Sequence, residues 1–205
     1  MRNRITHRKV FDRYMTEHEE RKLFKHLRRL RCPWARRDLA WMRVLRHTGI
    51  RVGALIRMTV RDARESLASG YLMVDGEKAK GGHGYEVYLT KPAQHAIQCL
   101  LGVRRELGRP MYPDSPLVVN RQGGFVSDRL LQIRMKNWCR AAGLKIEATP
   151  HWWRHTFAKR IMRHSTAQDP RAIAQLALGH KDSRSTEIYT LPDREDIEQA
   201  MREAS

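Results

Sequence analysis

Apolar residues recur at helical spacing over most of the chain. The first such run follows Thr16, whose spacing to Glu19 is that of a capping box, and Pro33 is expected to end it. Further helices are expected at about 36–47, 51–58, from 92 onward, and at 127–142, 150–164, 169–178 and 195–203.

Two short segments in the middle of the chain, 70–74 and 85–89, are instead typical of strands. The segment 75–84 between them is rich in glycine and charged residues, which favours a hairpin. The pattern therefore predicts a mainly α-helical domain with a small antiparallel β-sheet, which is an α+β fold.

The charge balance points to a polyanionic partner. The 205 residues, enough for one substantial domain, include 40 Lys and Arg against 22 Asp and Glu, a net charge of +18. Such a surplus of positive charge indicates nucleic acid first, although a merely solvated basic face or a membrane-surface binder stays possible at this point.

Cysteine usage and the terminus bear on location. The three cysteines lie far apart and form no CxxC pair, which favours a reducing compartment over a disulfide framework or a zinc finger. The first ten residues are basic without an apolar core, and no apolar run is long enough to cross a bilayer. We therefore expect a cytoplasmic protein without a membrane partner.

One candidate site lies at 149–157. If Pro150 starts a helix, His151 and Arg154 share one face, where a proton-transfer group beside a guanidinium would suit a phosphodiester. Taken alone, His and Arg on a helix are usually just solvated. His151 and His155 also have metal-ligand spacing, but no HExxH, carboxylate or cysteine accompanies them, so we expect no metal.

Two further pieces are weak by themselves. Arg51 follows a glycine that should stop a helix, and Leu178-Gly179-His180 leads through a polar segment to Tyr189. A lone tyrosine in such a place is most often a half-buried packing residue. No phosphate-binding loop of the GxxxxGK[ST] type is present, so nucleotide hydrolysis is not expected.

In combination these pieces resemble the catalytic domain of the tyrosine recombinase (phage integrase) family. The family motifs are an arginine in a T-G-hydrophobic-R turn, a hairpin lysine before glycine, H-x-x-R-H, L-G-H, and a tyrosine nine positions after that last histidine. They are matched here, in order, by Thr48 to Arg51, Lys80, His151 with Arg154 and His155, Leu178 to His180, and Tyr189.

The resemblance implies the chemistry and the role of each residue. Tyr189 would attack the scissile phosphate and form a 3′-phosphotyrosine, while Arg51 and Arg154 would neutralise the charge of the transition state. Lys80 would protonate the departing 5′ oxygen, and His151 would help to manage the tyrosine proton.

The remaining site residue is His180, which would hydrogen-bond a phosphate oxygen. The resemblance further implies that no cofactor is needed, because the cationic side chains replace a metal clamp and the phosphotyrosine conserves the bond energy that ATP would supply.

The match departs from the family in two places. Family members often carry Glu or Asp three positions after the first arginine, where this chain has Ala54, which puts in doubt how firmly Arg51 is held. Lys78 is a rival to Lys80, on the same side of an extended strand. We favour Lys80 because it directly precedes two glycines.

The domain plan is expected to be short. We interpret 1–15 as a basic arm and 16–205 as the catalytic domain, without the separate core-binding domain that most members carry; such chains resemble the recombinases that invert fimbrial promoter segments. Ile197 and Met201 form a narrow apolar stripe, and a comparable helix in the family docks into the next subunit. The stripe could also pack against its own domain.

These observations lead to a function hypothesis with alternatives. The leading one is a site-specific DNA recombinase acting by inversion, integration or resolution on double-stranded DNA, as a homotetramer on synapsed sites, with accessory DNA-bending proteins as possible partners. A type IB topoisomerase would share the chemistry, and a catalytically silent DNA-binding regulator would share the fold.

Overall fold

The structure, a computed structural model, describes residues 13–74, 84–179 and 200–204. Within these ranges the chain forms, in order, α1 (Glu17–Arg29), α2 (Pro33–Thr48), α3 (Val52–Arg57), α4 (Val60–Ser69), β1 (Tyr71–Val74), β2 (Tyr85–Tyr88), α5 (Lys91–Glu106), α6 (Asp128–Ala141), α7 (His151–His164) and α8 (Pro170–Leu178). The expected fold class, mainly helical with a small antiparallel sheet, is confirmed.

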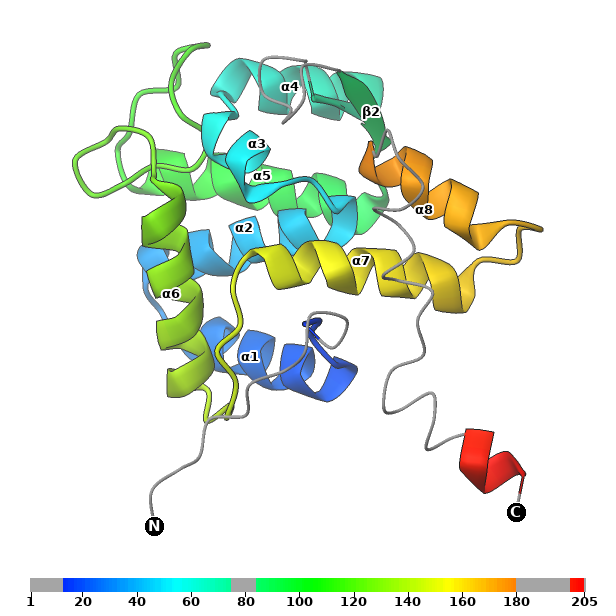
Figure 1. Cartoon of the computed structure of the whole chain (residues 1–205). Coiled ribbons are helices and arrows are strands. Elements are labelled where there is room, and N and C mark those ends of the chain that lie inside the picture. Colours follow the sequence, from blue (N-terminus) through cyan, green and yellow to red (C-terminus); the bar gives the residue numbers. More distant parts are fainter. Residues whose placement is uncertain (1–12, 75–83, 180–199, 205) are drawn as a thin grey trace.

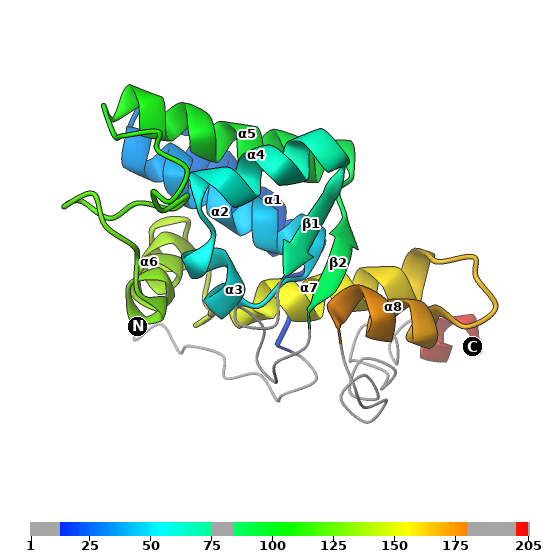
Figure 2. The ribbon, with the colours of Figure 1, turned by 90° about the horizontal axis from the view of Figure 1, so that it is seen from above.

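Helix α2 is the central element of the molecule (Figure 1). It packs against α1, α5 and α7, and in Figure 2 α5 and α7 lie on opposite sides of it. Trp41, Met42, Val44 and Leu45 of this helix are completely or almost completely buried. Burial of these large apolar side chains fixes α1, α5 and α7 on α2.

The two strands pair in antiparallel register, with Leu72 opposite Val87. Both of these side chains are buried, whereas Tyr71 and Tyr88 face outward and form an edge-on aromatic pair. The strands of the predicted hairpin are therefore confirmed, while its tip at 75–83 lies outside the described residues.

One expected helix boundary is wrong. Pro33 does not end the first helix, which stops at Arg29, but occupies the first turn of α2. Proline is tolerated there because the amide hydrogen that it lacks would have no partner within the helix. Helix α2 therefore begins three residues earlier than the periodicity indicated.

Helix α4 was not predicted, although its ends carry clear signals. The Thr59 hydroxyl accepts from the Asp62 amide, and the Asp62 carboxylate accepts from the Thr59 amide, which completes a capping box. Gly70 ends the helix in the left-handed conformation, with φ of 78°.

At the other end of the chain, residues 200–203 are helical, whereas 195–199 of the predicted last helix lie outside the described residues.

A buried carboxylate joins α2 to α6. Asp38 is fully buried and accepts hydrogen bonds on Oδ1 from Arg37 and from the Trp41 indole at 3.0 Å. Its Oδ2 accepts from Arg134 at 2.6 Å and from the Trp138 indole at 2.7 Å. All the side chains that donate to Asp38 therefore bind the same single negative charge.

Asp38→Asn should lower the free energy of unfolding by about 3 kcal/mol, because the neutral amide leaves two guanidinium groups without their counter-charge and directs an NH2 group at other donors. Urea unfolding followed by circular dichroism measures this loss. Asp114→Asn is the matched control, since Asp114 forms an exposed ion pair with Arg61 and its loss should leave the unfolding midpoint unchanged. If Asp38→Asn lowers the free energy of unfolding by less than about 1 kcal/mol, Asp38 is not the counter-charge that stabilises this cluster.

No helix in the described part of the chain combines the length and the apolar character needed to cross a membrane.

Candidate active site

Arg154 joins three segments that are far apart in the sequence. It lies in the first turn of α7 with only 2% of its surface exposed. Its Nη1 donates to the Gly49 carbonyl oxygen at 2.8 Å, and its Nη2 donates to the Leu178 carbonyl oxygen at 2.7 Å. The guanidinium is thereby fixed in a plane between the end of α2 and the end of α8.

Two glycines permit this close approach. Gly49 has φ of 64°, and a Cβ at this position would overlap the Phe157 ring of α7. Gly179 has φ of 61°, and a Cβ there would overlap the Tyr85 ring of β2. Both turns therefore require glycine for backbone conformation and for space.

Arg51 follows the first of these turns and is the N-cap residue of α3. Its carbonyl oxygen accepts from the amides of Ala54 at 2.9 Å and Leu55 at 3.2 Å, which fixes the backbone from which the half-buried side chain projects. Ala54 is 3% exposed and belongs to the apolar core. Position 54 therefore contributes to packing and supplies no carboxylate to Arg51.

His151 is the first residue of α7 and lies among positive charges. The residue as a whole is exposed, but partial burial of its ring from water lowers its pKa from the usual 6.5, and the charges of Arg154 and Arg51 lower it further. Asp128, the first residue of α6, opposes this shift. The ring is therefore neutral at pH 7, which is the form that can accept a proton.

The neighbouring His155 is buried, and its ring stands edge-on to that of His151 with centroids 4.7 Å apart. Over the residues that the structure describes, no group of three or more His, Cys, Asp or Glu side chains is arranged to hold a metal ion.

The structure thus brings together three of the six residues singled out from the sequence, namely Arg51, His151 and Arg154. The other three, Lys80, His180 and Tyr189, lie outside the described residues, as does Lys78. The segments beside them are placed, however, since Gly179, directly before His180, packs against Tyr85 of the strand that follows the Lys80 segment. The roles of these three residues stay predictions.

Sequence reasoning missed the groups that hold the site in place. The carbonyl oxygens of Gly49 and Leu178 carry no signature in the sequence, because every residue has one. The proximity of Asp128 to His151 depends on how the tertiary fold places the first residues of α6 and α7, and no local pattern indicates it.

Comparison with known proteins agrees with this geometry. Residues 13–195 match the model of the phage integrase family. The tyrosine recombinase XerC of Xanthomonas axonopodis pv. citri (strain 306) is 35% identical over 159 residues, which cover 78% of this chain and 48% of that protein. The chain spans about half the length of the curated relatives that it matches.

Solved structures show the same fold. The XerA recombinase superposes with a TM-score of 0.75 and 24% identity, over 98% of this chain and 65% of that one. The XerH site-specific recombinase bound to its difH substrate in a pre-cleavage complex gives a TM-score of 0.70 and 21% identity, over 94% and 55%. With its ordered motifs, its buried Arg154 and a family match over most of its length, the chain belongs to the phage integrase family of tyrosine recombinases.

Proposed function

We propose that this chain is the catalytic part of a site-specific recombinase that cuts and rejoins double-stranded DNA through a covalent phosphotyrosine. The observation that carries the proposal is the fixed guanidinium of Arg154, buried at the junction of three motifs beside Arg51 and His151. Such a preorganised cationic site suits the extra negative charge of a pentacoordinate phosphate. We assign residues 16–205 to this catalytic domain.

The chemical step is balanced by the chain's own residues. The Tyr189 oxygen forms a bond to phosphorus as the bond from phosphorus to the 5′ oxygen breaks. The hydroxyl proton of Tyr189 passes to His151, whose lowered pKa keeps it able to accept, and Lys80 supplies a proton to the leaving 5′ oxygen. Attack by a 5′-hydroxyl of another strand reverses the step.

His180 contributes a hydrogen bond to a non-bridging phosphate oxygen, in line with its position directly after the Gly179 turn. Arg51 and Arg154 share the remaining charge. Ala54 removes the carboxylate that often supports the first arginine in the family, and the fixed backbone at Arg51 is the compensating feature that we identify.

Double-stranded DNA is the proposed substrate. The net charge of +18 supports it, because phosphate contacts dominate the affinity of DNA-binding proteins. The XerH recombinase was crystallised bound to its difH substrate, and the Tn1549 transposon integrase was solved in complex with circular intermediate DNA, which fits the same class of ligand. Selection of bound duplexes from a random-sequence pool would identify the target site needed for the experiments below.

Cleavage should proceed at the same rate, within about twofold, in excess EDTA and in Mg²⁺, and without nucleotide, because Arg51, Lys80 and Arg154 supply the charge that a metal would otherwise provide. Covalent complex formation on a nicked duplex measures this rate. A magnesium-dependent nuclease assayed in parallel shows that chelation is complete. An absolute requirement for Mg²⁺ in the chemical step would exclude the mechanism.

We further propose that the protein acts in the cytoplasm as a tetramer on synapsed DNA, with accessory DNA-bending proteins as possible partners. The cysteines of the described chain are free thiols, which suits a reducing compartment. Ile173 and Leu176 of α8, 44% and 73% exposed, lie one turn apart and supply apolar surface for contact between protomers.

Deletion of residues 192–205 should reduce recombination between two sites by at least about tenfold, while affinity for a single site changes by less than about threefold. The reason is that the apolar stripe of Ile197 and Met201 would link protomers, not bind DNA; Met201 is 66% exposed. A strand-exchange assay and a gel-shift titration measure the two quantities. Glu203→Gln is the control, and full recombination by the truncated chain would show that the tail does not link subunits.

A further inference from the structure

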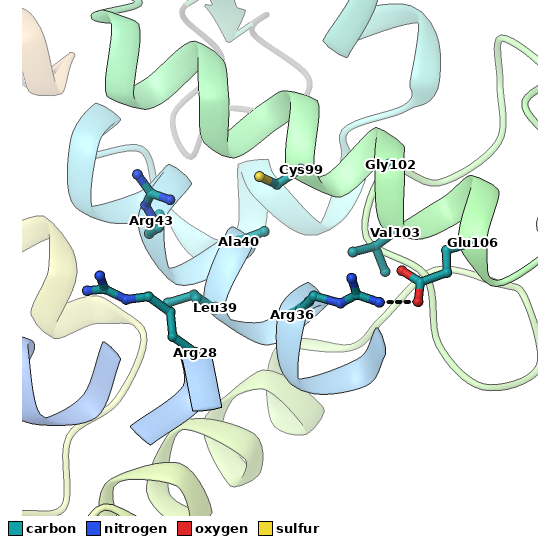
Figure 3. Close-up of a pocket in the computed structure, with 9 residues that line it drawn as sticks. All are labelled: Arg28, Arg36, Leu39, Ala40, Arg43, Cys99, Gly102, Val103 and Glu106. Atoms are coloured by element: carbon teal, nitrogen blue, oxygen red, sulfur yellow. Dashed lines mark hydrogen bonds and ion pairs between the residues drawn. The ribbon is translucent and has the colours of Figure 1, made fainter. Parts of the chain in front are cut away.

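A groove lies between α2 and α5, at the end of α1 (Figure 3). Its volume is about 480 Å³. On α2 it is lined at positions i, i+3, i+4 and i+7 from Arg36, and on α5 at the same four positions from Cys99. The groove therefore runs along two full turns of two neighbouring helices.

The floor of the groove is apolar. Leu39, Ala40 and Val103 form it, with exposures of 9%, 2% and 6%. Phosphate contacts need no apolar surface, whereas a docked helix buries one. Helix α5, which forms one wall of the groove, and α7, which carries His151 and Arg154, lie on opposite sides of α2 (Figure 2).

Two arginines at one end give the groove a positive rim. The guanidinium groups of Arg28 and Arg43 project at the same end of the groove, and neither forms an ion pair within the described part of the chain. At the other end, Arg36 pairs with Glu106, so its charge is compensated. The charge of Arg28 also acts on Glu20, but Glu20 is already paired with Arg46 and Arg160, so this end keeps an excess of positive charge that would attract carboxylates.

Gly102 has no role in the fold of the chain itself. It lies inside α5, where glycine destabilises a helix relative to alanine, and a Cβ built on it meets no atom of the described residues within 4 Å. Neither the backbone nor the packing of this chain requires glycine there. Its missing side chain does keep one wall of the groove low enough for another backbone to approach.

We propose that the groove between α2 and α5 binds an acidic amphipathic helix of a partner protein. The groove-lining residues of α2 and α5 have the same helical spacing, so a third helix can pack between them. Its apolar face would cover Leu39 and Val103 and pass over Gly102. Carboxylates on its flank would pair with Arg28 and Arg43. This surface is separate from the DNA-cleaving site, and the proposal does not depend on the proposed function.

The test uses the whole chain and an 18-residue synthetic helical peptide. Leucines at heptad spacing form one face of this peptide, and glutamates flank that face. Fluorescence anisotropy should show saturable binding that Gly102→Trp and Arg43→Glu each weaken by at least about tenfold. Ala68→Trp, which adds the same bulk on the exposed face of α4, should change affinity by less than about twofold. A peptide with lysine in place of each glutamate should not bind.

A second readout locates the peptide directly. In a Cys32→Ser background, Cys99 is the accessible thiol of the described chain, because Cys139 is fully buried and burial raises the pKa of its thiol to about 12. The bound peptide should slow alkylation of Cys99 at least about fivefold. Gly102→Ala should raise the thermal midpoint and weaken binding less than Gly102→Trp does, which separates loss of the groove from loss of the fold.

Several results would overturn the proposal. One is a lysine peptide that binds as tightly as the acidic peptide. Another is displacement of the acidic peptide by duplexes, with tighter-binding duplexes displacing it at lower concentrations. Unchanged binding by both Gly102→Trp and Arg43→Glu would place the peptide elsewhere. Self-association of the chain that Gly102→Trp abolishes would assign the groove to a second copy instead. DNA cleavage by Gly102→Trp should match the unaltered chain, because the groove lies outside the site.

Discussion

Tyr189→Phe should abolish covalent attachment to DNA while leaving DNA affinity within about twofold. The substitution removes only the attacking oxygen, and the ring and the 40 Lys and Arg side chains that attract phosphates remain. Covalent complexes on labelled duplex are counted on denaturing gels, and affinity is measured by gel shift in the same buffer.

The control for this variant is Tyr112→Phe, the same change at a tyrosine that is 73% exposed. It should retain covalent attachment at the full rate. If the Tyr189→Phe chain still forms adducts, the nucleophile is another residue, and the spacing from His180 has identified the wrong tyrosine.

Arg154→Lys should slow DNA cleavage by about a thousandfold. A lysine keeps the positive charge but cannot donate at once to the Gly49 and Leu178 carbonyl oxygens and to a phosphate in one plane. Both carbonyl groups are then left short of a donor in a buried place, so we expect some loss of stability as well.

The two effects are separable by measurement. Single-turnover cleavage gives the rate of the chemical step. Thermal unfolding gives the melting midpoint, and the cleavage assay must be run below that temperature. Arg160→Lys on the same helix is the matched control, because Arg160 pairs with Glu20 at 2.9 Å and lysine can keep that ion pair. Cleavage by Arg154→Lys within about tenfold of the unaltered chain would mean that the planar guanidinium is not part of the site.

The helices that the sequence predicted well are those with chemical signals at their ends. Thr16 with Glu19 caps α1, as expected, while Asp169 with Pro170 starts the expected helix α8 and Gly179 ends it. These signals are local, so they can be detected without tertiary information. Thr59 and Asp62 form an equally local signal for α4, a helix that the hydrophobic period alone does not predict.

The candidate site divides in the same way. The motif spacings indicated Arg51, His151 and Arg154, and the structure brings these three together. Two carbonyl oxygens hold Arg154, and partial burial of the ring together with the charges of Arg154 and Arg51 lowers the pKa of His151. Such features depend on how distant segments pack, and a pattern read along the chain does not contain them.

The groove between α2 and α5 could not be predicted for a related reason. Helix α2 is buried on most of its circumference, so its sequence shows no single polar face. From the sequence alone, Gly102 indicates only a less stable helix, and its role in the groove depends on the open space that the structure shows around it.

The central claim, that Tyr189 is the nucleophile, is tested most directly by trapping. The chain is incubated with a nicked duplex whose cleaved fragment diffuses away, so that rejoining is prevented, and the adduct is digested and sequenced by mass spectrometry. We predict a nucleotide remnant joined through its 3′ phosphate to the peptide that contains Tyr189. A remnant on any other residue, or no adduct from a chain that binds the duplex, would contradict the account.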